Sequence, residues 1–251
     1  QMHAKPVGEV RLDPDKMEVY NCEPVLKRAN GQHIMMLGDR QIVGITMRWD
    51  PSSGKLKSDI SSVALVLHDD FGVKYWHRSV ALTGDVVKHD AQGNITGGQV
   101  WQLCDLIDQF NVPGVTIETN GIGNFAPAAL KGALKARHIR CGVKEEHSVG
   151  NKNKRILEAL EGPLMSGLLW VHTSVIDTPE EGENSSRQYK NMRMFNPAIT
   201  EQPDDDLDSL AGAVTDSPER IGKIHRQNEA HESPNWRTDG GVAEATLDFN
   251  D

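Results

Sequence analysis

Residues 41–50, QIVGITMRWD, form a short apolar run that ends in Asp50 and is stopped by Pro51 and a Ser-Ser-Gly turn. A run of this length, rich in β-branched residues, predicts a buried strand. An aspartate at the last position of such a strand points out of the edge of the sheet, where a ligand can reach it. Asp50 is therefore the first candidate site residue, and the rest of the chain is interpreted around it.

Two later stretches also place carboxylates at the ends of expected elements. Residues 115–118, VTIE, are a β-branched run ending in Glu118, and residues 204–208, DDDLD, open an apolar helix. Acidic strand and helix ends that are far apart in sequence are what a metal-dependent nuclease needs. The sequence thus predicts catalytic carboxylates at Asp50, Glu118 and Asp205, with Asp204 and Asp208 as further candidate metal ligands.

The expected chemistry is two-metal hydrolysis of a phosphodiester by Mg²⁺ or Mn²⁺. Two such ions, about 3.5–4 Å apart, activate water and stabilise the leaving oxygen, and they prefer hard oxygen ligands. Asp50 would bridge the two ions, while Glu118 and Asp205 would hold one each. Asp208 follows Asp205 by three residues on the same helix face. Each carboxylate alone also fits an ordinary role, as a turn residue, a surface strand end or a helix cap.

Basic residues precede the apolar part of another expected helix. Lys152, Lys154 and Arg155 lie at its N-terminus. Positive charge is unfavourable there because it opposes the helix dipole, so these residues indicate a role other than helix stabilisation. Binding of backbone phosphates is one such role, because the free N–H groups there also attract anions. We expect these three residues to bind DNA. A second basic group, within residues 131–140, fits a solvated face equally well.

Length and composition limit the number of domains and the class of protein. With 251 residues, the chain suits one domain with extensions, or at most two. The net charge of −9 argues against coating nucleic acid by bulk electrostatics, although a local basic patch stays compatible with it. The three cysteines have no zinc spacing and favour a reducing compartment. Neither a signal peptide nor a membrane span is recognisable, and no phosphate-binding loop of an ATP-driven motor is present.

The order of expected elements predicts an α/β fold of the ribonuclease H-like type. It has a mixed five-stranded sheet, with an antiparallel meander and parallel strands, flanked by helices. In that arrangement the first and fourth strands are neighbours, which would bring Asp50 and Glu118 together. We expect the five strands at 41–50, 60–68, 73–82, 115–118 and 138–142, another strand or extended piece at 167–172, and helices at 99–110, 122–137, 153–164, 187–195 and 205–214. Residues 1–38 would be an N-terminal arm or linker, 39–222 the nuclease domain, and 223–251 a polar tail.

Four motifs in this order resemble a known family. They are DPSSG with a following Lys and Asp59 (50–59), IETNG (117–121), KNKRI (152–156) and DDDLDSL (204–210). Together they are similar to the C-terminal nuclease domain of tailed-phage large terminase subunits, most nearly those of short-tailed phages. The metal-binding carboxylates of that family map onto Asp50, Glu118 and Asp205. The turn after Asp50 is longer than the family's, and Ser209 replaces its alanine.

The resemblance implies an endonuclease that cuts concatemeric double-stranded viral DNA during genome packaging, in the host cell cytoplasm. Its partners would be the portal protein and the small terminase subunit, with an ATPase domain on the same full-length chain and no membrane. The first residue, Gln1, fits a piece of a longer protein. Two alternatives stay open. One is a resolvase- or transposase-like nuclease of the same fold, and the other is a portal or small-terminase docking module with weak cutting.

Overall fold

The structure, a computed structural model, describes residues 11–29, 32–52, 60–120, 124–177, 185–199 and 201–220. Several expectations concern residues outside these ranges. They include the acidic turn residue Asp59, most of the acidic loop that precedes residue 187, and the polar tail at 223–251.

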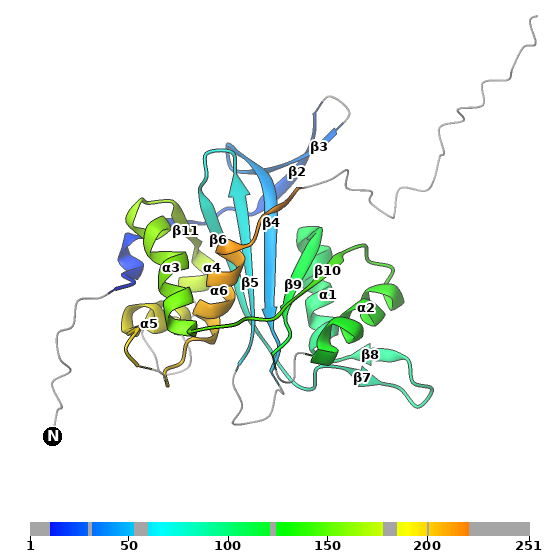
Figure 1. Cartoon of the computed structure of the whole chain (residues 1–251). Helices are drawn as coiled ribbons and strands as arrows, with labels where there is room; N and C mark the ends of the chain where they lie inside the picture. The colour runs from blue at the N-terminus through cyan, green and yellow to red at the C-terminus, as the bar shows by residue number, and fades with distance from the viewer. Residues whose placement is uncertain are drawn as a thin grey trace, which may run out of the picture.

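Five strands form the centre of the sheet. β4 (Arg40–Asp50), β5 (Ser61–Asp69) and β6 (Lys74–Leu82) make an antiparallel meander. β9 (Gly114–Glu118) lies parallel to β4, and β10 (Gly142–Glu146) lies parallel to β9 (Figure 1). The resulting order β6-β5-β4-β9-β10 is the predicted mixed sheet. The ribonuclease H-like fold is thereby confirmed, with the first and fourth strands side by side.

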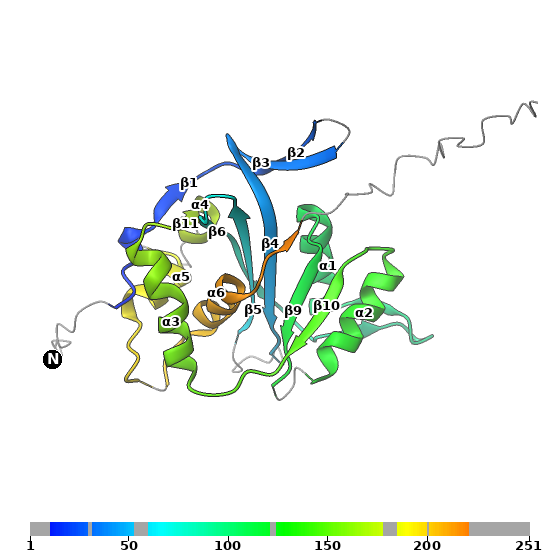
Figure 2. The same cartoon turned by 45° about the horizontal axis from the view of Figure 1, so that its top comes forward.

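Further strands extend the sheet beyond these five. β11 (Leu169–His172) lies parallel to β6, and β1 (Glu18–Tyr20) lies parallel to β11. A hairpin of β2 (Pro24–Ala29) and β3 (Gln32–Leu37) continues the sheet from the first half of β4 (Figure 2). β12 (Glu219–Arg220) runs antiparallel to β4. Much of the expected N-terminal arm is thus strand, which its prolines and interleaved polar residues hide in the sequence.

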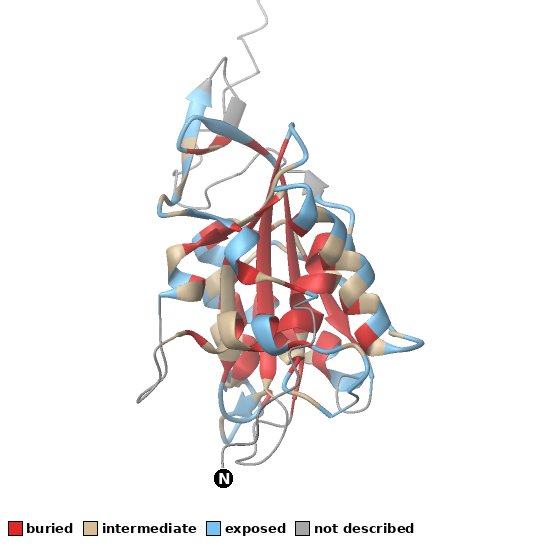
Figure 3. Cartoon of the chain, turned by 90° about the vertical axis from the view of Figure 1, so that its left-hand side faces the viewer, coloured by how far each residue is buried: buried red, intermediate tan, exposed pale blue. Residues whose placement is uncertain are grey.

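Helices cover both faces of the sheet. α1 (Gln99–Phe110) and α2 (Ala126–Ala136) lie on one face, and α3 (Lys152–Met165), α5 (Arg187–Met194) and α6 (Asp205–Thr215) lie on the other (Figure 1). β4, β5 and β9, between these helices, are buried along most of their length (Figure 3). The remaining elements are short: η1 (Pro14–Lys16), β7 (Lys88–His89), β8 (Ile95–Gly97) and α4 (Thr173–Ile176).

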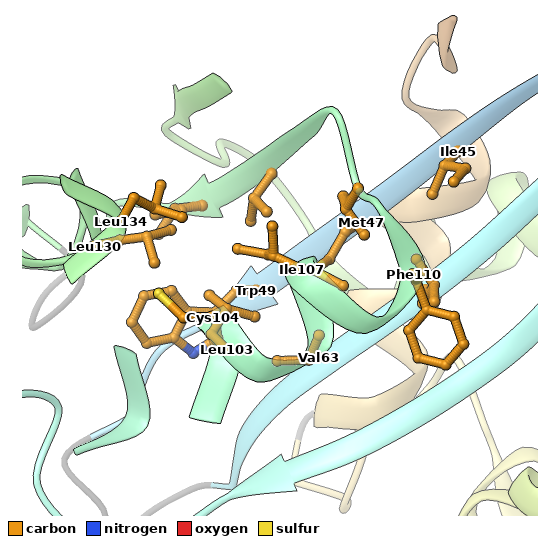
Figure 4. Packing of buried hydrophobic residues seen from close by; sticks show 14 of the residues in the cluster. Ile45, Met47, Trp49, Val63, Leu103, Cys104, Ile107, Phe110, Leu130 and Leu134 are labelled. Atoms are coloured by element: carbon orange, nitrogen blue, oxygen red, sulfur yellow. The ribbon is translucent and has the colours of Figure 1, made fainter. Parts of the chain in front are cut away.

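The two faces of β4 have different chemistry. Met47 and Trp49 pack against apolar side chains of α1 on one face (Figure 4). Because side chains alternate along a strand, Thr46, Arg48 and Asp50 face the other way. There the Thr46 hydroxyl donates a hydrogen bond of 2.7 Å to the carbonyl oxygen of Ala213 in α6. The polar face of β4 is therefore directed at the helix that begins with the acidic run.

One predicted strand is wrong in position. The expected strand at 138–142 is absent from the described residues there, and β10 begins only at Gly142. His138 adopts a positive φ of 57° just after α2, so the chain is still turning at that point. β10 then carries Lys144, Glu145 and Glu146, which do not look like a strand in the sequence. Charged residues are tolerated there because β10 lies at the margin of the sheet, where only β9 pairs with it among the described strands.

Candidate active site

Three carboxylates meet at the ends of β4 and β9 and at the start of α6. Ligand atoms of Asp50, Glu118 and Asp208 all lie within 4.8 Å of one another. The parallel pairing of Trp49 with Ile117 brings Asp50 and Glu118 together. Glu118 and Asp208 are buried, and Asp50 is partly buried. A buried set of hard oxygen donors fits Mg²⁺ or Mn²⁺, because such ions prefer carboxylate ligands and would offset the repulsion among them.

The crowding of carboxylates changes the acidity of Asp50. Burial, together with the neighbouring charge of Glu118, raises the pKa of Asp50 to about 7. Lys152 works in the opposite direction but does not outweigh these two effects. Without a bound cation, Asp50 thus takes up a proton near neutral pH more readily than an ordinary aspartate.

The other two aspartates of the acidic run lie to one side of this group. Asp205 accepts a hydrogen bond of 3.0 Å from the backbone N–H of Ile60, and its other oxygen lies 3.3 Å from Nζ of Lys152. Asp204 lies 2.8 Å from the same Nζ. The structure therefore places Asp208, one helical turn further along α6, beside Asp50 and Glu118. Asp204 and Asp205 face Lys152 instead.

Two of the three predicted DNA-binding residues lie against these aspartates. Nη2 of Arg155 donates to both oxygens of Asp208, at 2.8 and 2.9 Å. Lys152 also approaches Asp208, at 3.6 Å. Burial disfavours the charged form of Lys152, but the aspartates outweigh burial and raise its pKa. Both residues therefore act as counter-ions of the acidic cluster.

Lys154 is different, and the start of α3 explains why. The side chain of Asn151 caps the helix by accepting a hydrogen bond from Lys154 N at 3.1 Å. From this fixed start, Lys152 and Arg155 reach α6, against which α3 packs. Lys154 points away, is largely exposed, and lies 3.6 Å from Glu158. Its ammonium group is thus exposed at the surface of α3.

Two polar side chains hold Glu118 in place. Nδ2 of Asn120 donates a hydrogen bond of 2.7 Å to Oε1 of Glu118, and Nη2 of Arg48 lies 3.5 Å from Oε2. Arg48 is a buried residue that the sequence analysis missed. The available signal was a single arginine within an otherwise apolar strand, two residues before Asp50. The carboxylates opposite its guanidinium raise its pKa despite the cost of burial.

A buried hydrogen-bond chain supports the turn after Asp50. Nε1 of Trp49 donates to Oγ of Ser61 at 2.9 Å, and Ser61 donates to Oε1 of Gln99 at 2.7 Å. Nε2 of Gln99 in turn donates to the carbonyl oxygen of Ser52 at 3.1 Å. The first residue of α1 thus fixes the backbone two positions beyond Asp50.

Comparison with protein families gives one match. Residues 52–169 match the family described as "Terminase Bacteriophage T7, Ribonuclease H-like domain". No curated protein matches the chain. Among the described helices, none is long and apolar enough to cross a membrane.

Three solved structures are similar to this chain at low sequence identity. A mutant nuclease domain of the large terminase subunit gp2 of bacterial virus Sf6, with manganese and beta-thujaplicinol, has a TM-score of 0.41 and 8% identity, over 69% of this chain and 89% of that one. The HK97 bacteriophage large terminase has a TM-score of 0.39 and 13% identity, over 68% and 39%. The yeast mitochondrial Holliday junction resolvase Ydc2 has a TM-score of 0.36 and 13% identity, over 68% and 76%.

Proposed function

We propose that the chain is a metal-dependent DNA endonuclease of the phage terminase family, because residues 52–169 match that family's ribonuclease H-like domain. The observation that carries this proposal is the approach of Asp50, Glu118 and Asp208 to within 4.8 Å. These carboxylates come from two adjacent strand ends and one helix, so the fold itself brings them together.

Asp50, Glu118 and Asp208 would hold the metal, and Asp205 is a further candidate on the flank. Divalent ions bound there would activate water and stabilise the leaving oxygen of a cleaved phosphodiester. Neighbouring residues of the chain orient these ligands. Asn120 and Arg48 orient Glu118, and Gln99 fixes the backbone that follows Asp50.

The substrate we propose is double-stranded DNA, cut with little sequence preference. Lys154 is exposed in the first turn of α3 and could contact a backbone phosphate directly. Lys152 and Arg155 can do so once a cation takes over the neutralisation of the aspartates. The overall charge of −9 means that such contacts must be local.

The biological setting is also proposed. The family match supports the proposal that the enzyme cleaves concatemeric viral DNA during packaging in the host cytoplasm, with the portal protein and small terminase subunit as partners. An ATPase domain on the same full-length chain would drive translocation. We further propose the bounds 39–222 for the nuclease domain, with the arm and the tail on either side.

Cleavage of supercoiled plasmid tests the proposal. We expect nicked and then linear DNA with Mg²⁺ or Mn²⁺, and none with EDTA. Asp50→Asn, Glu118→Gln and Asp208→Asn should each abolish cleavage, while Asp205→Asn should reduce it less. Glu145→Gln is the matched control, because this exposed carboxylate of β10 pairs with Lys131, away from the site.

The outcomes separate the alternatives. Cleavage that survives Asp50→Asn would reject the proposed site. Preferential cutting of four-way junctions over linear duplex would favour a resolvase-like enzyme. Absence of cleavage under every metal condition would favour a docking module, or a nuclease that needs its motor domain.

A further inference from the structure

Arg48 joins the strand that carries Glu118 to the helix that carries Asp208. Its guanidinium lies 3.5 Å from Glu118 of β9, 3.1 Å from Glu146 at the end of β10, and 3.8 Å from Asp216 at the C-terminal cap of α6. Its side chain is only 3% exposed. One buried cation therefore holds three elements together directly behind the carboxylate group.

The path of the Arg48 side chain is fixed by α6. It passes Gly212 so closely that a Cβ at that position would lie 2.1 Å from Cδ of Arg48. Nη2 also donates a hydrogen bond of 3.2 Å to Oγ of Ser148, in the segment between β10 and α3. With its stem confined and its head surrounded by acceptors, Arg48 has little freedom to move away from Glu118.

Glu118 is thereby held from two sides. Asn120 donates to Oε1, and Arg48 faces Oε2. Lys152 and Arg155 approach the cluster from α3 and are about one-third exposed, and Arg155 lies 4.0 Å from Glu118. Arg48 differs from both because it is buried and is anchored by carboxylates outside the cluster.

We propose that Arg48 is a positioning residue of the metal site. It fixes Glu118 relative to Asp208 and is itself anchored by Glu146 and Asp216. The inference rests on the proposed function, since it concerns metal ligands. Partners of a ligand that lie outside the coordination sphere commonly set metal affinity, and their loss weakens it about 10- to 100-fold.

Simple electrostatics predicts the opposite result. Removing a cation from the neighbourhood of carboxylates should strengthen the binding of a divalent ion. A lysine should also serve as well as an arginine if charge alone mattered. Arg48, however, faces Glu118 with Nη2 and both Glu146 and Asp216 with Nη1, and the one nitrogen of a lysine does not reproduce this fork. The conservative variant therefore separates positioning from charge.

The test is calorimetric titration of the whole chain with Mn²⁺, beside thermal unfolding in EDTA to confirm that each variant folds. We expect Arg48→Lys and Arg48→Met to weaken Mn²⁺ binding about 10-fold or more. Glu146→Gln and Asp216→Asn, which keep the shape of the anchors, should weaken it measurably but less than the two Arg48 variants do. Glu145→Gln, a neighbour of Glu146 that contacts Lys131, should bind as the wild type does.

Two results would overturn the inference. One is wild-type affinity or tighter binding in Arg48→Lys and Arg48→Met. If these variants do not fold, wild-type affinity in both Glu146→Gln and Asp216→Asn has the same meaning. A wild-type chain that binds no Mn²⁺ would instead reject the proposed function, and this inference with it.

Discussion

Arg155 occupies both oxygens of Asp208, with hydrogen bonds of 2.8 and 2.9 Å from one guanidinium nitrogen. Asp208 is also one of the three carboxylates that converge at the site. A cation that binds Asp208 must therefore compete with Arg155 for the same acceptor atoms. Competition of this kind would couple metal binding to the release of a basic side chain that we propose contacts DNA.

Arg155→Gln should therefore strengthen the binding of Mn²⁺ in the absence of DNA. Because Arg155 is partly exposed, its pairing energy is modest, and the gain should be on the order of fivefold, or about 1 kcal/mol. The same variant should bind duplex DNA more weakly. Calorimetry with Mn²⁺, and fluorescence anisotropy with labelled DNA, measure the two effects. Lys154→Gln, in the same helix turn but paired with Glu158, should leave Mn²⁺ affinity unchanged. Weaker Mn²⁺ binding in Arg155→Gln would show that Arg155 organises the site instead of competing for it.

The raised pKa of Asp50 predicts a pH-dependent stability in EDTA. The folded carboxyl has a pKa of about 7, whereas an unfolded aspartate has one of about 3.9. Between these values the folded chain binds the extra proton, so the contribution of Asp50 to stability falls as pH rises through this window. Asp50→Asn removes the penalty. The variant should gain stability over the wild type by on the order of 2 kcal/mol more at pH 8 than at pH 5.

Urea unfolding in EDTA at the two pH values measures this difference. Burial lowers the pKa of His68 and of His77 to about 4, which gives a slope of opposite sign below pH 6.5. These histidines are present in both proteins, so their contribution cancels in the comparison. Added Mg²⁺ should stabilise the wild type at pH 8 but not Asp50→Asn. An equal stability gain at both pH values would mean that Asp50 ionises normally.

A second buried ion pair holds α6 in place. Asp206 is fully buried, and Arg187 at the start of α5 donates to its two oxygens at 2.7 and 3.0 Å. Arg187→Met should cost about 3–5 kcal/mol, because it leaves a buried carboxylate without its partner. Replacing both residues, as Arg187→Met with Asp206→Leu, should recover much of the loss. Denaturant unfolding measures both variants. A cost below about 1 kcal/mol for the single change would mean that Ser62 and Ser79, which also donate to Asp206, suffice.

The sequence predicted the central sheet because its strands are apolar, β-branched and bounded by turns. That pattern identifies β4, β5, β6 and β9 almost to the residue, and their order then determines that β4 and β9 are neighbours. The position of β10 was predicted wrongly because a strand at the margin of the sheet buries few side chains and can carry charges. β2 likewise alternates between half-buried and exposed residues beyond the central strands, and β3 buries only Met35 and Leu37 among its described side chains.

The site was predictable only where it depends on strand ends. Asp50 and Glu118 follow from local pattern, whereas the proximity of Asp208 depends on how α6 is placed against β4. Contacts such as that between Thr46 and Ala213 set this placement, and no local pattern encodes them. The role of Arg48 could not be predicted for a related reason, because its partners Glu146 and Asp216 come from distant segments of the chain. The catalytic and DNA-binding roles stay predictions.

The close approach of Arg48 to Gly212 gives the last prediction. In an exposed helix, replacing glycine by alanine stabilises a protein by about 0.4–1 kcal/mol. Gly212→Ala should do the reverse. Its Cβ would lie 2.1 Å from Cδ and 2.2 Å from Nε of Arg48. Arg48 cannot move away without breaking its contacts with Glu118, Glu146 and Asp216. We expect a loss of about 1–3 kcal/mol, together with weaker Mn²⁺ binding as Glu118 loses its support.

Gly162→Ala is the matched control for this change. Gly162 lies inside α3, and a Cβ there would meet no atom within 4 Å. Pro163 disfavours a helical residue with a Cβ before it, which offsets the usual gain from alanine, so this variant should keep about the wild-type stability and Mn²⁺ affinity. Urea unfolding and calorimetric titration of the two variants make the comparison. If Gly212→Ala is as stable as Gly162→Ala, the stem of Arg48 has another route past α6. Its hold on Glu118 would then be looser than the packing indicates.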